Sequence, residues 1–159
     1  MQPATLPALR LPRIARPYRQ GSPVFDAATL QARFDDVAAE YVRRLRLRVE
    51  AVEPGRVTLA LPVAPDLVHV GGVLCGQAIM AAADTAMLLA LMAQLGEFRP
   101  MTTVQLNTSF VRPVPKDAGH VTIVGRVLRP GRTLSYGDVE FTTPDGKLVA
   151  HATTTYAML

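Results

Sequence analysis

The sequence predicts an α+β protein in which a six-stranded antiparallel sheet wraps around one long central helix, with a further helix on its N-terminal side. Three observations support this fold class. Residues 78–95 form an apolar segment of helical length, two runs of alternating hydrophobicity precede it, and four strand-like runs follow it. Turn residues connect successive runs, and strands joined by hairpins are antiparallel. A sheet of this size can bury an apolar helix by curling around it.

The N-terminal part of the chain divides into an arm and the start of a domain. Residues 1–24 are rich in Pro and Arg and lack hydrophobic periodicity, so we expect a flexible arm. A cleaved transit peptide is an alternative, although serine is scarce there. Apolar residues then recur with helical spacing from Phe25 to Tyr41, with Asp26 as the expected N-cap. Residues 25–159 are expected to form a single domain.

Alternating hydrophobicity and turn residues define the expected strands. They cover residues 45–50, 57–62, 102–111, 121–128, 134–142 and 148–156. The dipeptides Pro54-Gly55 and Asp145-Gly146 favour tight turns before the second and the sixth strand. The apolar helix is expected to end at Gly96, because glycine readily takes the left-handed conformation that terminates helices.

The composition argues against a nucleic-acid-binding protein and against a metal site. Four of the 17 basic residues lie within residues 1–20, which hold no acidic residue, so 13 basic residues balance 13 acidic ones in the remainder. A large basic groove is therefore not expected. The single cysteine forms no internal disulfide, and no Cys or His spacing suits zinc. We expect a cytoplasmic protein without a cofactor.

One carboxylate interrupts the apolar helix. Residues 78–95 are just long enough to cross a bilayer, but Asp84 near their middle favours a buried core helix over a membrane span. Burying an unpaired carboxylate is costly, and perturbed carboxylates of this kind concentrate at functional sites. Asp84 is therefore the first catalytic candidate. The alternative is a structural acid that bonds the backbone or Thr85.

Residues 45–157 resemble the hot-dog-fold acyl-CoA thioesterases of the PaaI-like, phenylacetic acid degradation type. The resemblance rests on the strings Gly72-Val73-Leu74-Cys75-Gly76-Gln77-Ala78, Ala83-Asp84-Thr85-Ala86, Thr103-Val104-Gln105-Leu106-Asn107-Thr108-Ser109-Phe110-Val111-Arg112-Pro113 and Gly146-Lys147-Leu148-Val149-Ala150. It implies a hot-dog fold and hydrolysis of an acyl-CoA thioester to free acid and coenzyme A. It also implies a homodimer, often paired into a homotetramer as a dimer of dimers, with active sites at the dimer interface.

In this family a His-Gly-Gly motif opens the central helix, and an acidic residue follows nine positions after the His. Here Cys75 stands in place of the His and Asp84 lies nine residues later. The resemblance thus implies that Asp84 is the catalytic carboxylate and that Gly76 donates its backbone N–H to the thioester oxygen. Gln77 replaces the second glycine, and both Cys75 and Gln77 are expected to line the substrate site.

Four further residues complete the expected substrate-binding set. His69 stands where the family often has Asn, and Thr103 matches a Ser or Thr that helps to hold water. Arg112 and Arg132 lie at a strand end and in a turn, where arginines can pair with the phosphates of coenzyme A. The alternatives are an ordinary loop histidine, an ordinary strand threonine and solvated turn arginines.

The spacing of the two catalytic candidates itself favours a dimer. Thioester hydrolysis needs a donor for the oxyanion and a group that activates water or attacks directly. The first turn of the helix offers the donor at Gly76 or Gln77, and Asp84 offers the second group. Two helical turns, about 12 Å, separate them. We therefore expect Gly76 of one subunit to work with Asp84 of the other.

Two other functions are open on the sequence alone. A non-catalytic protein that binds acyl-CoA or an acyl chain is one, because Cys75 replaces the motif His. A hot-dog dehydratase or hydratase is the other, but such enzymes use a catalytic His and the helix motif here has none. Neither the acyl group nor the packing of a tetramer follows from the sequence.

Overall fold

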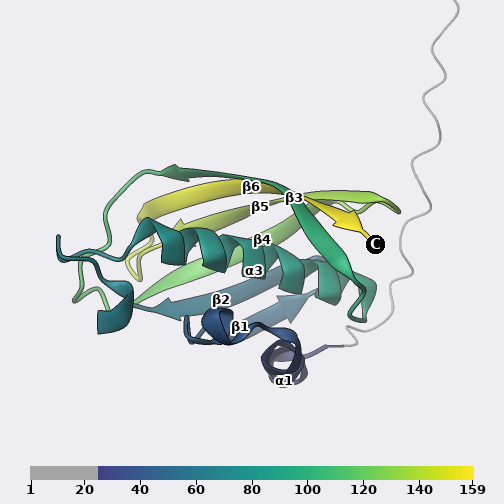
Figure 1. Cartoon of the computed structure of the whole chain (residues 1–159), viewed down its shortest axis with the longest axis horizontal. Coiled ribbons are helices and arrows are strands. Elements are labelled where there is room, and N and C mark those ends of the chain that lie inside the picture. Colours follow the sequence, from purple (N-terminus) through teal and green to yellow (C-terminus); the bar gives the residue numbers. More distant parts are fainter. Residues whose placement is uncertain (1–24) are drawn as a thin grey trace, which may run out of the picture.

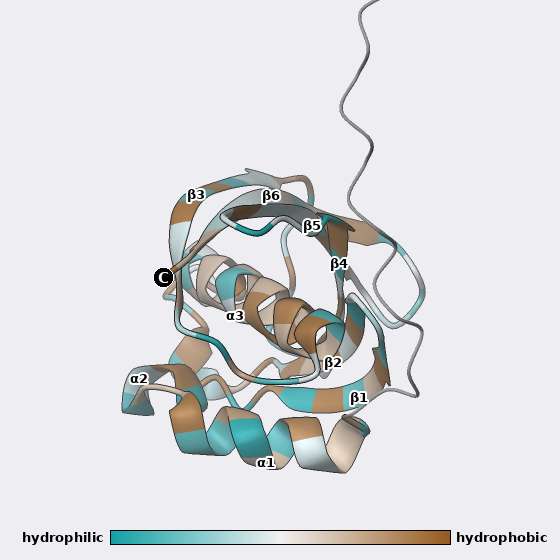
Figure 2. Ribbon diagram, turned by 90° about the vertical axis from the view of Figure 1, so that its right-hand side faces the viewer, coloured by the Kyte–Doolittle hydropathy of each residue, from teal (hydrophilic) through white to brown (hydrophobic). Residues whose placement is uncertain are grey.

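The computed structural model describes residues 25–159, so the expected arm at residues 1–24 lies outside the described residues. Six strands form one antiparallel sheet in the order β1-β2-β4-β5-β6-β3, which curls around helix α3 (Figures 1 and 2). The strands are β1 (Arg48–Glu53), β2 (Arg56–Pro62), β3 (Met101–Phe110), β4 (His120–Arg129), β5 (Leu134–Thr142) and β6 (Leu148–Met158). The helices are α1 (Ala27–Val37), α2 (Glu40–Arg43), the short 3-10 helix η1 (Pro65–Leu67) and α3 (Gly76–Leu95). The predicted fold class is confirmed.

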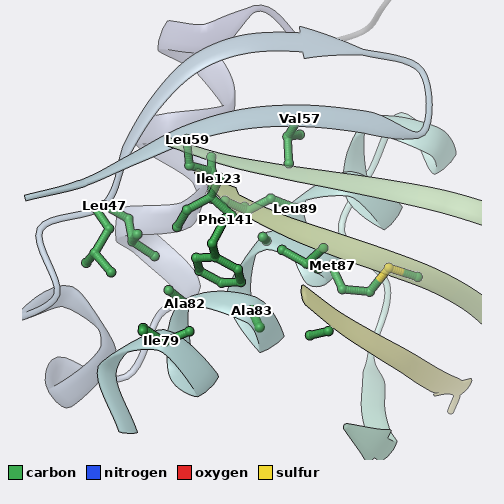
Figure 3. Close-up of a cluster of buried hydrophobic side chains, with 14 of the residues drawn as sticks. Leu47, Val57, Leu59, Ile79, Ala82, Ala83, Met87, Leu89, Ile123 and Phe141 are labelled. Atoms are coloured by element: carbon green, nitrogen blue, oxygen red, sulfur yellow. The ribbon is translucent and has the colours of Figure 1, made fainter. Parts of the chain in front are cut away.

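Helix α3 forms the centre of the hydrophobic core. It is long and apolar enough to cross a membrane by length and composition, but 67% of its apolar window is buried inside the protein. Figure 3 shows Phe141 of β5 and Ile123 of β4 among the side chains gathered over Ala82 and Ala83 of α3. At Gly125 of β4 an added Cβ would lie 2.9 Å from a carbonyl oxygen of α3, so only glycine allows this approach. The apolar helix is therefore the core helix.

The segment before the sheet differs from its prediction in one respect. Asp26 caps α1 as expected, in a capping box with Thr29. The single helix expected as far as Tyr41 is wrong, because α1 ends at Val37 and α2 begins at Glu40. The guanidinium of Arg43 donates to the backbone carbonyls of residues 35 and 38, at 3.1 and 2.9 Å, and so satisfies carbonyls at the break.

The first strand begins later than its alternating pattern predicts. Leu45 and Leu47 are buried, yet β1 starts only at Arg48. Between the two leucines, Arg46 has a φ of 56°, an unusual conformation for a non-glycine residue. The side chain of Arg46 donates two hydrogen bonds of 3.1 and 2.7 Å to Asp66 at this bend. Alternation here marks buried positions but not strand pairing.

The other elements lie within two residues of their predicted bounds. Gly96 ends α3 with a φ of 74°, as predicted for a terminating glycine. Gly55 and Gly146 take φ values of 73° and 80° in the two predicted tight turns. Strand β3 has β6 on one side only, so its other edge is open within the chain.

A charged cluster joins three strands on the outer face of the sheet. Arg126 of β4 donates two hydrogen bonds of 2.9 Å to Asp138 of β5, and Nε2 of His151 on β6 lies 3.2 Å from the same carboxylate. Burial alone would raise the pKa of Asp138, but the hydrogen bonds from Arg126 and His151 outweigh burial and hold this pKa below its usual value. The cluster should therefore stabilise the fold while Asp138 is ionised.

We expect Asp138→Asn to lower the free energy of unfolding by about 1 kcal/mol near neutral pH, since both partners are partly exposed. The pKa of Asp138 is lower in the folded protein than in the unfolded chain. Its stabilising effect is therefore fully present above the pKa of the unfolded chain, and it is lost as the pH falls through the pKa of the folded protein. Urea unfolding at about pH 7 and about pH 3 measures the free energy of unfolding of the wild type and of Asp138→Asn. The exposed Glu97 pairs with Arg99, so Glu97→Gln is the control. An equal loss for Asp138→Asn at both pH values would contradict the assignment.

Candidate active site around Asp84

Asp84 lies on α3 opposite the paired strands β3 and β6. The hydroxyl of Thr103 on β3 donates to Asp84 Oδ1 at 2.6 Å. The phenol of Tyr156 on β6 donates to the same oxygen at 2.6 Å and lies 2.9 Å from the backbone carbonyl of Asp84. Thr103 and Tyr156 are direct partners in the β3–β6 ladder. Neighbouring positions of two strands thus fix one carboxylate oxygen.

The second oxygen of Asp84 is not held in this way. Within residues 25–159 no hydrogen bond reaches Asp84 Oδ2, and none of the ion pairs found there involves Asp84. The residue is half-buried. The hydroxyl of Thr85, the alternative partner, donates instead to the carbonyl of Ala81 at 2.8 Å. Asp84 therefore offers Oδ2 to a water or a ligand.

Tyr156 is a site residue that the sequence reasoning missed. Its burial, and then the adjacent negative charge of Asp84, raise the pKa of Tyr156 well above its usual value. The phenol therefore keeps its proton and can donate it to Asp84 in a hydrogen bond. In the sequence, only the alternating pattern of β6 indicates that Tyr156 points inward. This pattern does not show which residue of the helix Tyr156 contacts.

The start of α3 forms the other half of the predicted site. Cys75 is the N-cap residue, with an extended backbone and no side-chain capping hydrogen bond. The N–H groups of Gly76 and Gln77 have no acceptor inside the helix, and no backbone acceptor for them occurs among the described residues. The thiol of Cys75 is partly buried against the core. Two backbone donors are thus unpaired at the positive end of the helix dipole.

His69 lies in the exposed loop that leads to α3. Its Nδ1 accepts a hydrogen bond of 2.9 Å from the backbone N–H of Gly71, so the proton of the neutral ring is on Nε2. An antiparallel bridge between Val68 and Leu74 closes the loop. His69 lies near the start of α3 in sequence, and no hydrogen bond joins it to Asp84 within the described chain.

A groove of 310 Å³ lies beside the start of α3. Its lining consists of Leu74, Gly76, Ile79, Phe110, Val111, Arg112, Pro113 and Val114. An added Cβ on Gly76 would lie 3.2 Å from the ring of Phe110, which shows how closely the end of β3 approaches the helix. Arg112 donates to the backbone carbonyl of Leu148.

The structure brings some predicted site residues together and separates others. Asp84 and Thr103 meet at one place, whereas Gly76 begins α3 about 12 Å away along the helix axis. Arg112 lies just after the end of β3, where its side chain meets the start of β6, and Arg132 lies in the turn before β5, beside the end of β6. The two arginines therefore do not share a site within one chain. No group of three or more potential metal ligands occurs in residues 25–159.

Comparison with known proteins gives the family. Residues 71–150 match the family described as the Thioesterase superfamily. A protein of Saccharolobus solfataricus, named "Putative esterase SSO2140", is 35% identical over 115 residues, which are 72% of this chain and 80% of that protein. The chain belongs to the thioesterase superfamily. This membership supports a hydrolase that acts on thioesters.

Solved structures of the superfamily share the fold. The chain superposes with a TM-score of 0.67 and 27% identity on a mutant of the phenylacetic acid degradation protein PaaI from Thermus thermophilus, covering 76% of this chain and 100% of that one. A hypothetical thioesterase protein with coenzyme A from Streptococcus pneumoniae gives a TM-score of 0.66 at 22% identity, covering 71% and 85%. The hot-dog fold and the relationship to PaaI-type thioesterases are confirmed.

The hydroxyl contacts generate a prediction about thioester hydrolysis. We expect Tyr156→Phe to lower kcat about tenfold or more with little change in KM, because it removes one hydrogen bond to an ionised oxygen that orients Asp84. Thr103→Val should also lower kcat, because it removes the other hydroxyl that donates to Asp84. Tyr136→Phe, on the outer face of the sheet, is the matched control. Steady-state kinetics test this, and an unchanged kcat in both variants would show that Asp84 needs no orientation.

Proposed function

We propose that the protein hydrolyses an acyl-CoA thioester to a free acid and coenzyme A, with Asp84 as the general base. One observation carries this proposal. Asp84 is fixed through Oδ1 by two neutral hydroxyls, while no donor to Oδ2 occurs within residues 25–159. Membership of the thioesterase superfamily supports the reaction class. No metal or organic cofactor enters the proposed chemistry.

In the proposed reaction, Asp84 Oδ2 accepts a proton from a water molecule as the water oxygen attacks the thioester carbon. The carbonyl oxygen becomes an oxyanion and accepts hydrogen bonds from the N–H of Gly76, assisted by that of Gln77, at a helix N-terminus. Collapse of the tetrahedral intermediate breaks the C–S bond, and the leaving thiolate of coenzyme A takes up the proton that Asp84 had accepted, which restores the carboxylate. Direct attack by the same carboxylate oxygen is the alternative chemistry.

The proposal requires a homodimer, and the open edge of β3 supports one. Thr103, which bonds Asp84, stands near one end of this strand, and Phe110, which contacts Gly76, stands at the other. Antiparallel pairing of β3 with a second copy would bring Thr103 of one chain beside Phe110 of the other. Asp84 would then face Gly76 of the partner subunit. The dimer would also bury three exposed apolar side chains along this edge, Val104, Phe110 and Val111, which are 60%, 53% and 53% exposed.

The choice of coenzyme A as the carrier has separate support. A structural neighbour from Streptococcus pneumoniae is described with coenzyme A. The same antiparallel dimer would bring Arg112 of one chain and Arg132 of the other to one end of the sheet, where they would meet the phosphates. His69, Cys75 and Gln77 would line the thioester end of the site. We place the protein in the cytoplasm, and we propose that dimers pair into tetramers.

We expect Asp84→Asn and Asp84→Ala to lower kcat by about 10²-fold or more while the protein stays folded. Asparagine keeps the shape and still accepts hydrogen bonds from Thr103 and Tyr156, so its effect isolates the loss of the base. Release of free thiol from a panel of acyl-CoA substrates measures activity. Asp36→Asn, on the exposed face of α1, is the control.

Two outcomes of this assay would contradict the proposal. Near wild-type turnover by Asp84→Asn on the best substrate would make the carboxylate structural. Binding of acyl-CoA by the wild type without any turnover would favour the non-catalytic binding protein, which the substitution of Cys75 for the motif His motivates.

A second experiment tests the shared site. Asp84→Asn and Gly76→Pro should each be nearly inactive as homodimers, because the first removes the base and the second removes a backbone donor. Proline suits the first helical position, and the preceding Cys75 already has an extended backbone. Mixed dimers carry both changes in one site and none in the other. They should regain up to about half of the wild-type activity per dimer.

Native mass spectrometry confirms that mixed dimers form. A mixture of Asp84→Asn with Asp84→Ala is the matched control and should regain nothing, since every site then lacks the carboxylate. No recovery in confirmed mixed dimers of Asp84→Asn with Gly76→Pro would contradict a site built from two subunits.

A further inference from the structure

We propose that the groove beside Gly76 holds the acyl part of the substrate and that the ring of Phe110 sets the length of acyl chain accepted. The inference rests on the proposed function for the identity of the thioester. It adds the substrate class, an apolar acyl group, and a residue that determines specificity. Gly76, the proposed oxyanion donor, belongs to the lining of this groove, so the thioester carbon would lie at its mouth.

The chemistry of the lining favours an apolar occupant. Leu74, Ile79, Val111, Pro113 and Val114 present hydrocarbon side chains. The charged lining residue, Arg112, donates one N–H to the carbonyl of Leu148, and its remaining N–H groups are the ones proposed to meet the phosphates outside the groove. An acyl chain needs no polar partner and gains from burial, whereas the two amides of a pantetheine arm would lose hydration there without side-chain partners. The groove therefore suits the acyl group better than the coenzyme.

The size of the groove also restricts its occupant. A volume of 310 Å³ lies at the lower limit of small-molecule sites, which span about 300–1,000 Å³. It can hold one segment of an acyl-CoA but not the whole molecule. An acyl group that extends from the thioester would fill the groove while the nucleotide stays outside.

Phe110 forms the wall that limits this space. Cζ and Cε1 of its ring would lie 3.2 and 3.3 Å from a Cβ on Gly76, so the ring lies against the first turn of α3. In the single chain the ring is 53% exposed and stands at the last residue of β3, so the core does not enclose it, although the proposed dimer would cover part of it. Removing it would extend the groove without opening a cavity in the core.

The test compares chain-length profiles of the full-length protein. Hydrolysis of acyl-CoA substrates from butanoyl to hexadecanoyl is measured for the wild type, Phe110→Ala and Phe110→Trp. Each methylene that becomes buried should raise kcat/KM about fourfold. In Phe110→Ala the ratio of kcat/KM for dodecanoyl-CoA to that for butanoyl-CoA should rise about tenfold or more. In Phe110→Trp the ratio should fall, and this variant keeps an aromatic ring if alanine destabilises the fold.

Tyr136→Ala is the matched control, because Tyr136 is an exposed aromatic residue on the outer face of β5, away from the groove. Its chain-length profile should equal that of the wild type. An equal fall in kcat/KM for every substrate in a Phe110→Ala protein that native mass spectrometry shows to be dimeric would mean that the groove holds the pantetheine arm, and would overturn the inference. An unchanged profile in both Phe110 variants would overturn it as well.

Calorimetric binding of S-alkyl-CoA thioethers, which cannot be hydrolysed, separates the inference from the proposed function. Phe110→Ala should bind S-dodecyl-CoA more tightly relative to S-butyl-CoA than the wild type does. If this preference shifts while the wild type hydrolyses no acyl-CoA, the proposed reaction fails and the acyl groove stands. If the wild type hydrolyses acyl-CoA and the preference does not shift, or if no thioether binds, the acyl groove is wrong.

Discussion

Burial of the apolar helix α3 shapes the whole sheet. Helix α3 can leave water only if the sheet closes around it, and the sheet must then approach the helix closely at small residues such as Gly125 and Ala86. Closure also decides the surroundings of Asp84, because it brings strands β3 and β6 over this position of the helix. A carboxylate at this position must find donors on the sheet or reach solvent, and Asp84 does both.

The way in which Asp84 is held has a chemical meaning. A cationic partner would cancel the charge that a base needs, and it would compete with water for both oxygens. Thr103 and Tyr156 are neutral hydroxyls, so they orient the carboxylate and leave its charge in place. Tyr156 lies within hydrogen-bond distance of both the side chain and the backbone of Asp84, which ties the last strand to the middle of the helix. The same contacts thus serve the core and the candidate site.

The sequence predicted most of the fold, because local chemistry determines most of it. Periodicity revealed the strands, and the residues Gly55, Gly96 and Gly146 marked turns and a helix end that require a positive φ. The late start of β1 accompanies the positive φ of Arg46, whose side chain pairs with Asp66, twenty positions away in sequence. Tyr156 was missed for a related reason. Its meeting with Asp84 follows from the position of β6 over α3, which no local pattern contains.

The strand order has a consequence for how the protein is made. Strand β3 directly follows the apolar helix in sequence, but its partner is β6, the final strand of the chain. During synthesis the helix and β3 leave the ribosome about 40 residues before the strand that completes the sheet over them, at roughly 5–20 residues per second. For several seconds the most hydrophobic segment of the protein can be covered only by the elements that precede it and not by β4, β5 and β6. The arrangement that later shelters Asp84 therefore makes the nascent chain vulnerable to aggregation.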